Sequence, residues 1–145
     1  MDEKYHLALK TAFASEFAFA LKAQNFHWNV EGPLFYPLHL LFERIYDEVY
    51  GSIDTFAEQL RALQVQTPAS LEKFSMLTKV SDENAVPDFH SMLSELLEDS
   101  KRMANIFRIT FDMAEQNGDH GLSNFLADRQ DAHKKHSWML RASLK

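Results

Sequence analysis

Helix-breaking residues are few in this sequence, and they are unevenly spaced. Only four Gly and four Pro occur in 145 residues, with the prolines at positions 33, 37, 68 and 87. Gly and Pro are the strongest local interrupters of regular structure. Between them, apolar residues recur at i, i+3 and i+4, the spacing of one helix face. The sequence therefore predicts an all-α fold built from a few long helices.

The breakers and capping residues divide the chain into four long helices. The first two are predicted over about residues 3–30 and 36–63, separated by the Gly-Pro pair at positions 32 and 33. A long connection follows, in which residues 70–74 predict a short, capped extra helix. The last two helices are predicted over about 86–116 and 121–143. We therefore expect one domain over residues 1–145, a four-helix bundle with a short helix in the crossover.

Composition excludes several classes of protein. The chain has no cysteine, so disulfides, cysteine-zinc sites and cysteine nucleophiles are absent. No stretch approaches the ~18 apolar residues of a membrane span. The first residues lack the basic-then-apolar pattern of a secretory signal, so we expect a cytoplasmic location. The formal net charge of −6 disfavours a general attraction to nucleic acid.

The first predicted helix is apolar around most of its circumference. A helix of this kind is buried on several sides. One explanation is a single large core, but four helices in 145 residues leave little room to enclose this helix completely. We therefore favour an oligomer, in which neighbouring subunits cover the remaining apolar faces.

Potential metal ligands form a stripe on the second predicted helix, beside its apolar stripe. His39 and Glu43 are four residues apart, and so are Asp54 and Glu58, so the members of each pair face the same way. Imidazole and carboxylate together suit iron, manganese or zinc. His39 and Asp54 are about 22 Å apart along the helix, at 1.5 Å per residue. The two pairs therefore cannot share a metal within one chain.

His27 brings the first helix into this pattern. It lies five residues before Gly32, and His39 lies seven after it, so a helical hairpin places both at similar heights. His27, His39 and Glu43 then form one half-site, and the distant acidic pair forms another. A two-fold axis near the middle of the second helix joins each half-site to the complementary half of a partner. The pattern predicts two equivalent metal sites per dimer.

The remaining histidines have simpler interpretations. We interpret His6, His90 and His120 as surface or hydrogen-bonded residues, which is the commoner role of a lone histidine. His133 and His136 are three residues apart on the last predicted helix and could bind a metal together. Their lysine neighbours and lack of carboxylate partners instead predict a solvated face.

Several motifs together resemble the Dps family of miniferritins. Residues 25–33 (NFHWNVEGP), followed by Phe35 and Leu38-His39, are similar to the signature of its first two helices. Residues 54–58 (DTFAE) resemble its D-x-x-A-E motif, with Arg61 slightly displaced from its usual place. Residues 138–140 (WML) resemble its last helix, so the similarity spans essentially the whole chain.

This resemblance implies a ferritin-like bundle that assembles, through two-fold dimers, into a homo-dodecameric cage. Such a cage oxidises Fe(II) with hydrogen peroxide or dioxygen and stores ferric mineral inside, which protects against oxidative damage. Carried over by residue, the iron ligands are those of the two half-sites: His27, His39, Glu43, Asp54 and Glu58. Glu43 stands where Asp is common in the family. Trp28 matches a tryptophan that takes up oxidising equivalents, although packing at an interface explains it equally well.

Two further properties of the family transfer less directly. DNA-binding members often use mobile basic tails, but the predicted helices here begin and end close to the chain termini. Residues 140–145 add only two positive charges, so we expect DNA binding to be weak or absent. Asp119 and Asp128 are candidates for an acidic entry pore, although acids at a helix start are commonly just solvated.

Two rival functions stay open on the sequence alone. A di-iron oxidase of the ferritin or rubrerythrin kind carries its metals inside one bundle and needs Glu-x-x-His on two helices. Only residues 3–6 fit that motif, and the last two helices carry no second copy. The other rival is a non-catalytic helical assembly protein, in which the acidic residues and histidines merely decorate the surface.

Overall fold

The computed structural model describes residues 3–145, and this part of the chain folds into five helices without strands. The bounds are α1 Glu3–Asn29, α2 Phe35–Ala62, α3 Leu71–Leu77, α4 Phe89–Gln116 and α5 His120–Ser143. The predicted all-α, ferritin-like four-helix architecture is confirmed, and each long helix ends within a few residues of its expected bound.

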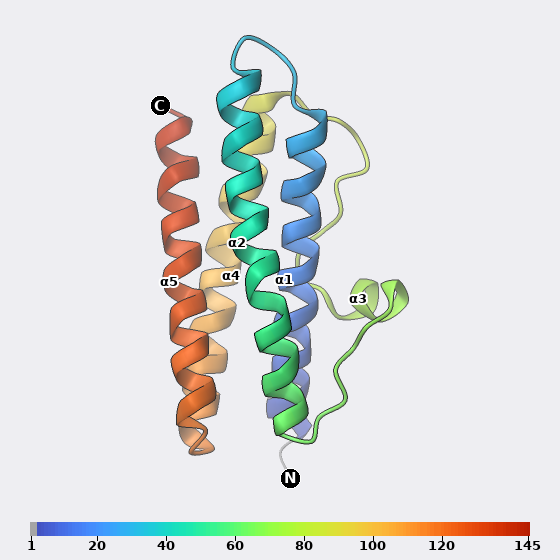
Figure 1. Cartoon of the computed structure of the whole chain (residues 1–145), viewed down its shortest axis with the longest axis vertical. Coiled ribbons are helices and arrows are strands. Elements are labelled where there is room, and N and C mark those ends of the chain that lie inside the picture. Colours follow the sequence, from blue (N-terminus) through green and yellow to red (C-terminus); the bar gives the residue numbers. More distant parts are fainter. Residues whose placement is uncertain (1–2) are drawn as a thin grey trace.

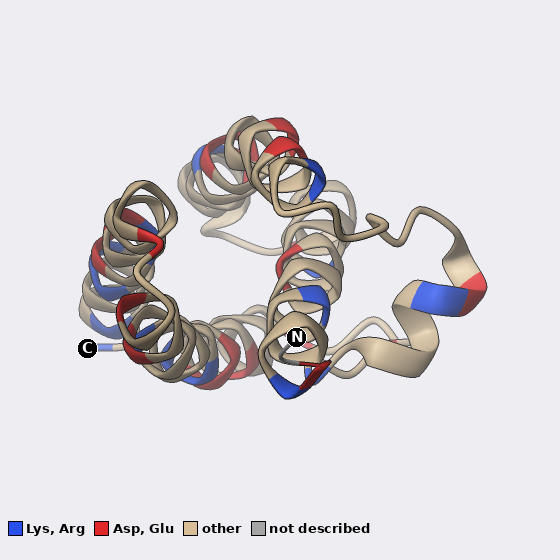
Figure 2. Ribbon diagram, turned by 90° about the horizontal axis from the view of Figure 1, so that it is seen from below, with Lys and Arg blue, Asp and Glu red and all other residues tan. Residues whose placement is uncertain are grey.

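Two antiparallel hairpins make the bundle. α1 packs along α2, α4 packs along α5, and the crossover that carries α3 runs along the outside of the bundle (Figure 1). Seen end-on, the four long helices surround a common centre, while α3 projects to one side beyond α1 (Figure 2). α3 packs against α1 alone among the helices, so it leaves much of its own surface outside the fold.

Local chemistry explains where the helices begin. Gly32 adopts a φ of +117° in the tight turn between α1 and α2, a backbone conformation that favours glycine. The Ser70 side chain accepts a hydrogen bond from the backbone N–H of Lys73 and caps α3. Asp88 does the same for the N–H of Ser91 and caps α4, which starts later than the sequence predicts.

The core fills the space between the long helices with large apolar side chains. α2 contributes most of its predicted apolar stripe in fully or nearly fully buried form: Leu38, Phe42, Ile45, Val49, Phe56 and Leu60. α1 buries most of its apolar residues too, but Leu7, Leu21 and Trp28 stay exposed in the single chain. The bundle therefore cannot cover every face of α1.

No helix in residues 3–145 combines the length and the apolar character needed to cross a lipid bilayer.

Candidate metal centre

The two histidines of the first hairpin hold each other across the α1–α2 interface. Nδ1 of His27 lies 2.7 Å from the carbonyl oxygen of His39, and Nδ1 of His39 lies 2.7 Å from the carbonyl oxygen of His27. The rings stack with their centroids 3.8 Å apart. This reciprocal pairing confirms that the hairpin places both residues at one height.

These hydrogen bonds determine the tautomer of each ring. A carbonyl oxygen only accepts, so both Nδ1 atoms must carry the proton and donate it. The neutral form of each ring then has a free lone pair on Nε2, which is the form that binds a metal. A hydrogen bond from the other ring nitrogen to a carbonyl is the usual way in which proteins orient a ligating histidine.

Glu43 completes a three-residue cluster with the two histidines. One ligand atom from each of His27, His39 and Glu43 can be chosen so that all three lie within 4.8 Å of one another. It is the one cluster of this kind found in residues 3–145. Two imidazoles and a carboxylate form a donor set that suits iron, zinc or manganese.

Aromatic rings surround the histidine pair. Phe35 stacks on His39 with ring centroids 4.9 Å apart, and Tyr46 meets His27 edge-on at 5.2 Å. Burial raises the pKa of the Tyr46 phenol, and the carboxylates of Asp47 and Glu43 raise it further. The sequence reasoning missed both rings as parts of the site, although Tyr46 lies on the same stripe of α2 as Glu43.

Asp54 and Glu58 lie on the same helix as Glu43 but near its other end. Both are exposed. At 1.5 Å per residue, Asp54 is about 22 Å along α2 from His39. The structure of a single chain therefore brings together three of the five predicted ligands and leaves the other two facing outward.

Comparisons with known proteins identify the family. The model of the family described as "Ferritin-like domain" matches residues 7–145. The "DNA protection during starvation protein" of Helicobacter pylori is 33% identical over 138 residues, which cover 94% of this chain and 95% of the relative. The protein of the same name from Brevibacillus brevis is 34% identical over 128 residues, which cover 86% and 83%. The chain belongs to the Dps family of ferritin-like proteins.

Solved structures agree with this assignment. Dps from Thermosynechococcus elongatus superposes with a TM-score of 0.95 at 27% identity, covering 99% of this chain and 91% of its own. A Dps protein from Bacillus brevis superposes with a TM-score of 0.92 at 28% identity, covering 100% of both chains. The similarity therefore includes the crossover helix as well as the bundle.

Trp28 of this Dps protein points away from the core. It follows the ligand candidate His27 directly, yet its side chain is 63% exposed whereas His27 is buried. The exposure of Trp28 fits either role predicted for it, packing at an interface or uptake of oxidising equivalents.

The interpretation of His133 and His136 as a solvated face is wrong for this Dps protein. Both are buried, with 0% and 2% of their surface exposed. Nε2 of His133 donates to Glu16 at 2.6 Å, and Nε2 of His136 donates to Glu48 at 2.8 Å. The partners come from α1 and α2, so a search for carboxylates along α5 could not find them.

The remaining polar candidates occupy ordinary positions. His90 and His120 are exposed, as expected, while His6 is half-buried beside the ring of Tyr5. Asp119 accepts a hydrogen bond from the Tyr5 hydroxyl at 2.8 Å and so ties the start of α1 to the α4–α5 turn. Asp128 is exposed. A pore role for these two acids stays a prediction.

Proposed function

We propose that this Dps protein is a miniferritin that oxidises Fe(II) and stores the ferric product inside a closed cage in the cytoplasm. The observation that carries the proposal is the cluster of His27, His39 and Glu43, whose two histidines are oriented with Nε2 free for a metal. Its relative from Vibrio cholerae is described as a member of a superfamily of ferritin-like diiron-carboxylate proteins, and iron fits the donor set found here.

The cluster supplies only part of a coordination sphere, and the partner subunit completes it. Three side chains leave further positions of an iron open. Asp54 and Glu58 are exposed carboxylates on the same helix, too far along it to reach the cluster of their own chain. A two-fold axis across the middle of α2 brings Asp54 and Glu58 of each subunit to the histidines of the other. Each dimer then holds two equivalent sites.

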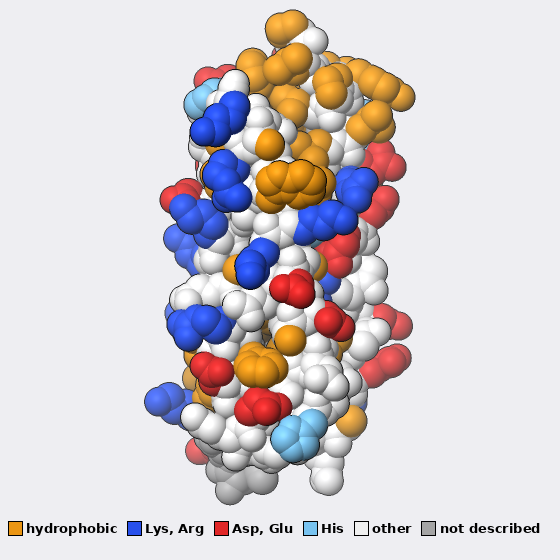
Figure 3. All heavy atoms as spheres, turned by 90° about the vertical axis from the view of Figure 1, so that its left-hand side faces the viewer, with side chains coloured by type: hydrophobic (Ala, Val, Ile, Leu, Met, Phe, Trp, Pro, Cys, Tyr) orange, Lys and Arg blue, Asp and Glu red, His pale blue; other side chains and the backbone are white. Residues whose placement is uncertain are grey.

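The surface of the single chain supports this assembly. Hydrophobic side chains gather at the end of the molecule where the α1–α2 turn lies (Figure 3), and the exposed ones there include Leu34, Phe35, Tyr36 and Leu40. Exposed apolar groups that form a contiguous patch mark interaction sites. We assign this end of the bundle to subunit contacts in a dodecamer.

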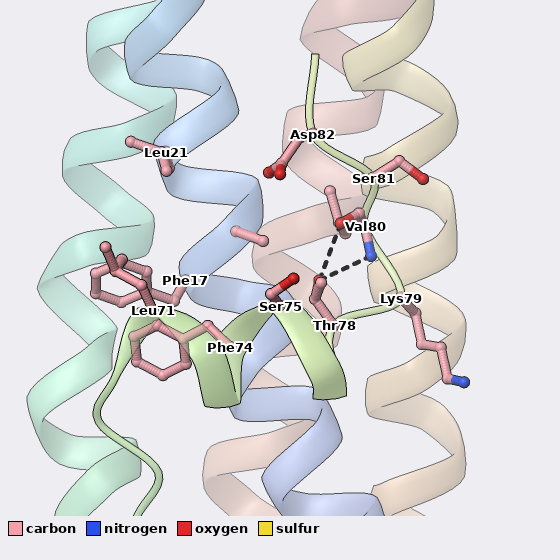
Figure 4. A pocket seen from close by; sticks show the side chains of 11 residues that line it. Phe17, Leu21, Leu71, Phe74, Ser75, Thr78, Lys79, Val80, Ser81 and Asp82 are labelled. Carbon is pink, nitrogen blue, oxygen red and sulfur yellow. Dashed lines mark hydrogen bonds between the residues drawn. The ribbon is translucent and has the colours of Figure 1, made fainter. Parts of the chain in front are cut away.

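A second apolar surface lies beside α3. Phe17 and Phe74 stack with ring centroids 4.5 Å apart and line a hollow of about 730 Å³ between α1, α3 and the crossover (Figure 4). Leu71 at its edge is 79% exposed. The length of the crossover is explained if α3 packs against the two-fold partner, because a connection this long usually has a role of its own.

The proposed chemistry uses iron as substrate. Two Fe(II) ions give one electron each to one hydrogen peroxide molecule, which becomes two hydroxide ions, and the Fe(III) products hydrolyse to mineral. The carboxylates are hard ligands that favour Fe(III), and the neutral imidazoles help to hold Fe(II) before oxidation. Dioxygen is the alternative oxidant. Protection follows from removing iron and peroxide together.

DNA binding contributes little to the proposed function. The chain carries a net charge of −6, and affinity for DNA depends on neutralising phosphates with clustered lysines and arginines. We expect the mobility of plasmid DNA to be unchanged by the assembly at neutral pH and physiological salt. Tight, salt-sensitive retardation would contradict this expectation.

Mixed dimers test whether the site is shared. One parent carries His27→Ala and His39→Ala, and the other carries Asp54→Ala and Glu58→Ala. In a heterodimer one interface site receives both mutated halves and the other receives neither. Both parents should assemble but oxidise Fe(II) slowly, and verified heterodimers should recover about half of the wild-type rate per dimer.

The control is His90→Ala, which removes an exposed histidine outside the cluster and should leave the rate unchanged. Light scattering of every variant should give a mass near that of twelve chains. Inactive heterodimers from intact assemblies would show that the ligands act within one chain or are structural. A stable wild-type monomer would contradict the cage, and bound iron without saturable oxidation would favour a non-catalytic assembly protein.

A further inference from the structure

Two acidic side chains from separate elements meet where the crossover approaches α4. Glu83 lies in residues 78–88, which run along the bundle from the end of α3 to the start of α4 (Figure 1), and Glu95 lies in the second turn of α4. Their carboxyl groups form a side-chain hydrogen bond with each other. Carboxylates only accept hydrogen bonds, so one of the two groups must carry a proton and donate it. An isolated glutamate would have lost that proton well below neutral pH.

The surroundings of the two groups decide which one holds the proton. The hydrogen bond from Glu95 lowers the pKa of Glu83, and a second bond lowers it further, from the backbone N–H of Ala85 to Glu83 Oε1 at 2.9 Å. Partial burial raises the pKa of Glu95 to about 7, and the hydrogen bond and the negative charge of Glu83 act in the same direction. Glu95 is therefore the donor and Glu83 the acceptor.

The other charged groups around Glu95 leave the proton in place. Lys22 faces it from α1 with only 6% of its side chain exposed, and its Nζ lies 2.8 Å from Asp99 Oδ2 but 3.8 Å from Glu95 Oε1. Asp99, one turn further along α4, also pairs with Arg102 at 3.1 Å. The charge of Lys22 lowers the pKa of Glu95, whereas that of Asp99 raises it. The buried ion pair thus acts on Glu95 in both directions.

The segment that contains Glu83 has few other polar ties to the bundle. It forms neither helix nor strand over residues 78–88. Two hydrogen bonds join its backbone to α1, from the N–H of Lys79 to the Ser15 hydroxyl at 2.9 Å and from the Asn25 side chain to the carbonyl oxygen of Glu83 at 3.2 Å. The bond between Glu83 and Glu95 adds a tie from the middle of the segment to α4.

We propose that Glu95 and Glu83 form a proton-operated latch that fastens the crossover to α4. While Glu95 keeps its proton, the two groups hold together. Once Glu95 loses it, two carboxylates face each other and repel, so residues 78–88 open more often. Because the pKa of Glu95 is raised in the folded chain, the latch is closed in mild acid and weakens as the pH rises toward about 7. The segment leads directly out of α3, so the latch also sets how firmly the end of α3 is held.

Infrared spectroscopy of the assembled protein tests the protonation. The C=O stretch of a protonated carboxyl group lies at a higher frequency than the bands of carboxylates and backbone amides. At about pH 6, wild type should show this band for about one group per chain more than Glu95→Gln. The difference should disappear as the pH rises, with a midpoint at about 7. Glu83→Gln should also remove the band, because Glu95 then loses its anionic neighbour. Glu98→Gln, at an exposed position of α4, is the control and should keep it.

Tryptic cleavage after Lys79 tests whether the proton holds the crossover. Lys79 is exposed within the latched segment, and a protease cuts there only when the chain opens locally. At about pH 8, Glu95→Gln and Glu83→Gln should each be cut about fivefold more slowly than wild type, because an amide donates the hydrogen bond without an added proton. Glu98→Gln should be cut at the wild-type rate.

Either of two results would overturn the latch. A wild-type band at about pH 6 no larger than that of Glu95→Gln would show that Glu95 is already ionised. Cleavage after Lys79 at equal rates in wild type and both latch variants would show that other contacts hold the crossover. Neither measurement involves iron, so the latch can fail while the proposed ferroxidase stands, and the reverse.

Discussion

The chain contains two histidine pairs that look alike in sequence and differ in what they can bind. His27 and His39 donate from Nδ1 to backbone carbonyls, so their Nε2 atoms stay free. His133 and His136 instead donate from Nε2 to carboxylates, so the nitrogen that faces the acidic groups is already used. The first pair is available to an incoming metal, whereas both Nε2 atoms of the second pair are already hydrogen-bonded to carboxylates.

The two histidine pairs also differ in whether a cationic side chain of the protein pairs with the carboxylates beside them. Beside the first pair, no arginine or lysine in residues 3–145 forms an ion pair with Glu43, so an incoming cation can neutralise it. In the interior, Arg129 already forms ion pairs with both Glu16 and Glu48. Residue type alone therefore does not decide whether a histidine–carboxylate group binds metal. The deciding factor is whether the protein supplies its own cation.

The largest expected effect comes from removing the internal cation. In chelator-treated buffer, Arg129→Met should lower the free energy of unfolding by about 3–5 kcal/mol, because it leaves the buried carboxylate of Glu16 without its guanidinium partner. Urea unfolding followed by circular dichroism measures the change. His90→Ala, at an exposed position, is the control and should stay within about 0.5 kcal/mol of wild type. A loss below about 1 kcal/mol for Arg129→Met would contradict the ionic role of this network.

The next largest effect is on the rate of Fe(II) oxidation, which should depend on the first histidine pair and not on the second. Combined His27→Ala and His39→Ala should slow peroxide-driven Fe(II) oxidation by about 100-fold or more, because loss of metal-site groups costs at least this order of affinity or rate. His136→Gln removes an imidazole of the internal network and should leave that rate unchanged. Stopped-flow absorbance of ferric product measures both. Equal losses from the two variants would show that the pairs do not differ in function.

The smallest expected effect is a dependence of stability on pH, which comes from Glu48 and His136 in the interior. The pKa of Glu48 is lowered from 4.5 to about 2, so its stabilising contribution is complete above pH 4.5 and is lost as the pH falls toward 2. Burial also lowers the pKa of His136, so its contribution is lost as the pH falls below 6.5. Both groups make acid destabilising.

Glu48→Gln tests this dependence. The variant should be less stable than wild type at neutral pH, and the difference should shrink between about pH 4.5 and 2 as the wild-type carboxylate gains its proton. The partial exposure of Glu48 keeps the effect modest, because solvent screens the ion pair. Urea midpoints measured across this pH range check it. A constant difference between the two proteins would mean that Glu48 does not titrate with folding.

The sequence by itself determined the helical architecture and the register of the first hairpin. Breakers at positions 32 and 33 and the apolar stripe of α2 are local signals, and helical periodicity converts them directly into faces. The pairing of His27 with His39 followed because a tight turn leaves one register for two antiparallel helices. The 22 Å between His39 and Asp54 needed only the helical rise.

Only the tertiary structure decided the fate of His133 and His136. Their partners, Glu16 and Glu48, are 117 and 88 residues away in the chain, on helices that meet α5 only in the folded bundle. The lysines beside them on α5 indicated a solvated face, because a helix shows its own neighbours in sequence but not the helices that cover it. A charged residue is buried where the rest of the fold supplies its countercharge, and that is settled only when distant helices come together.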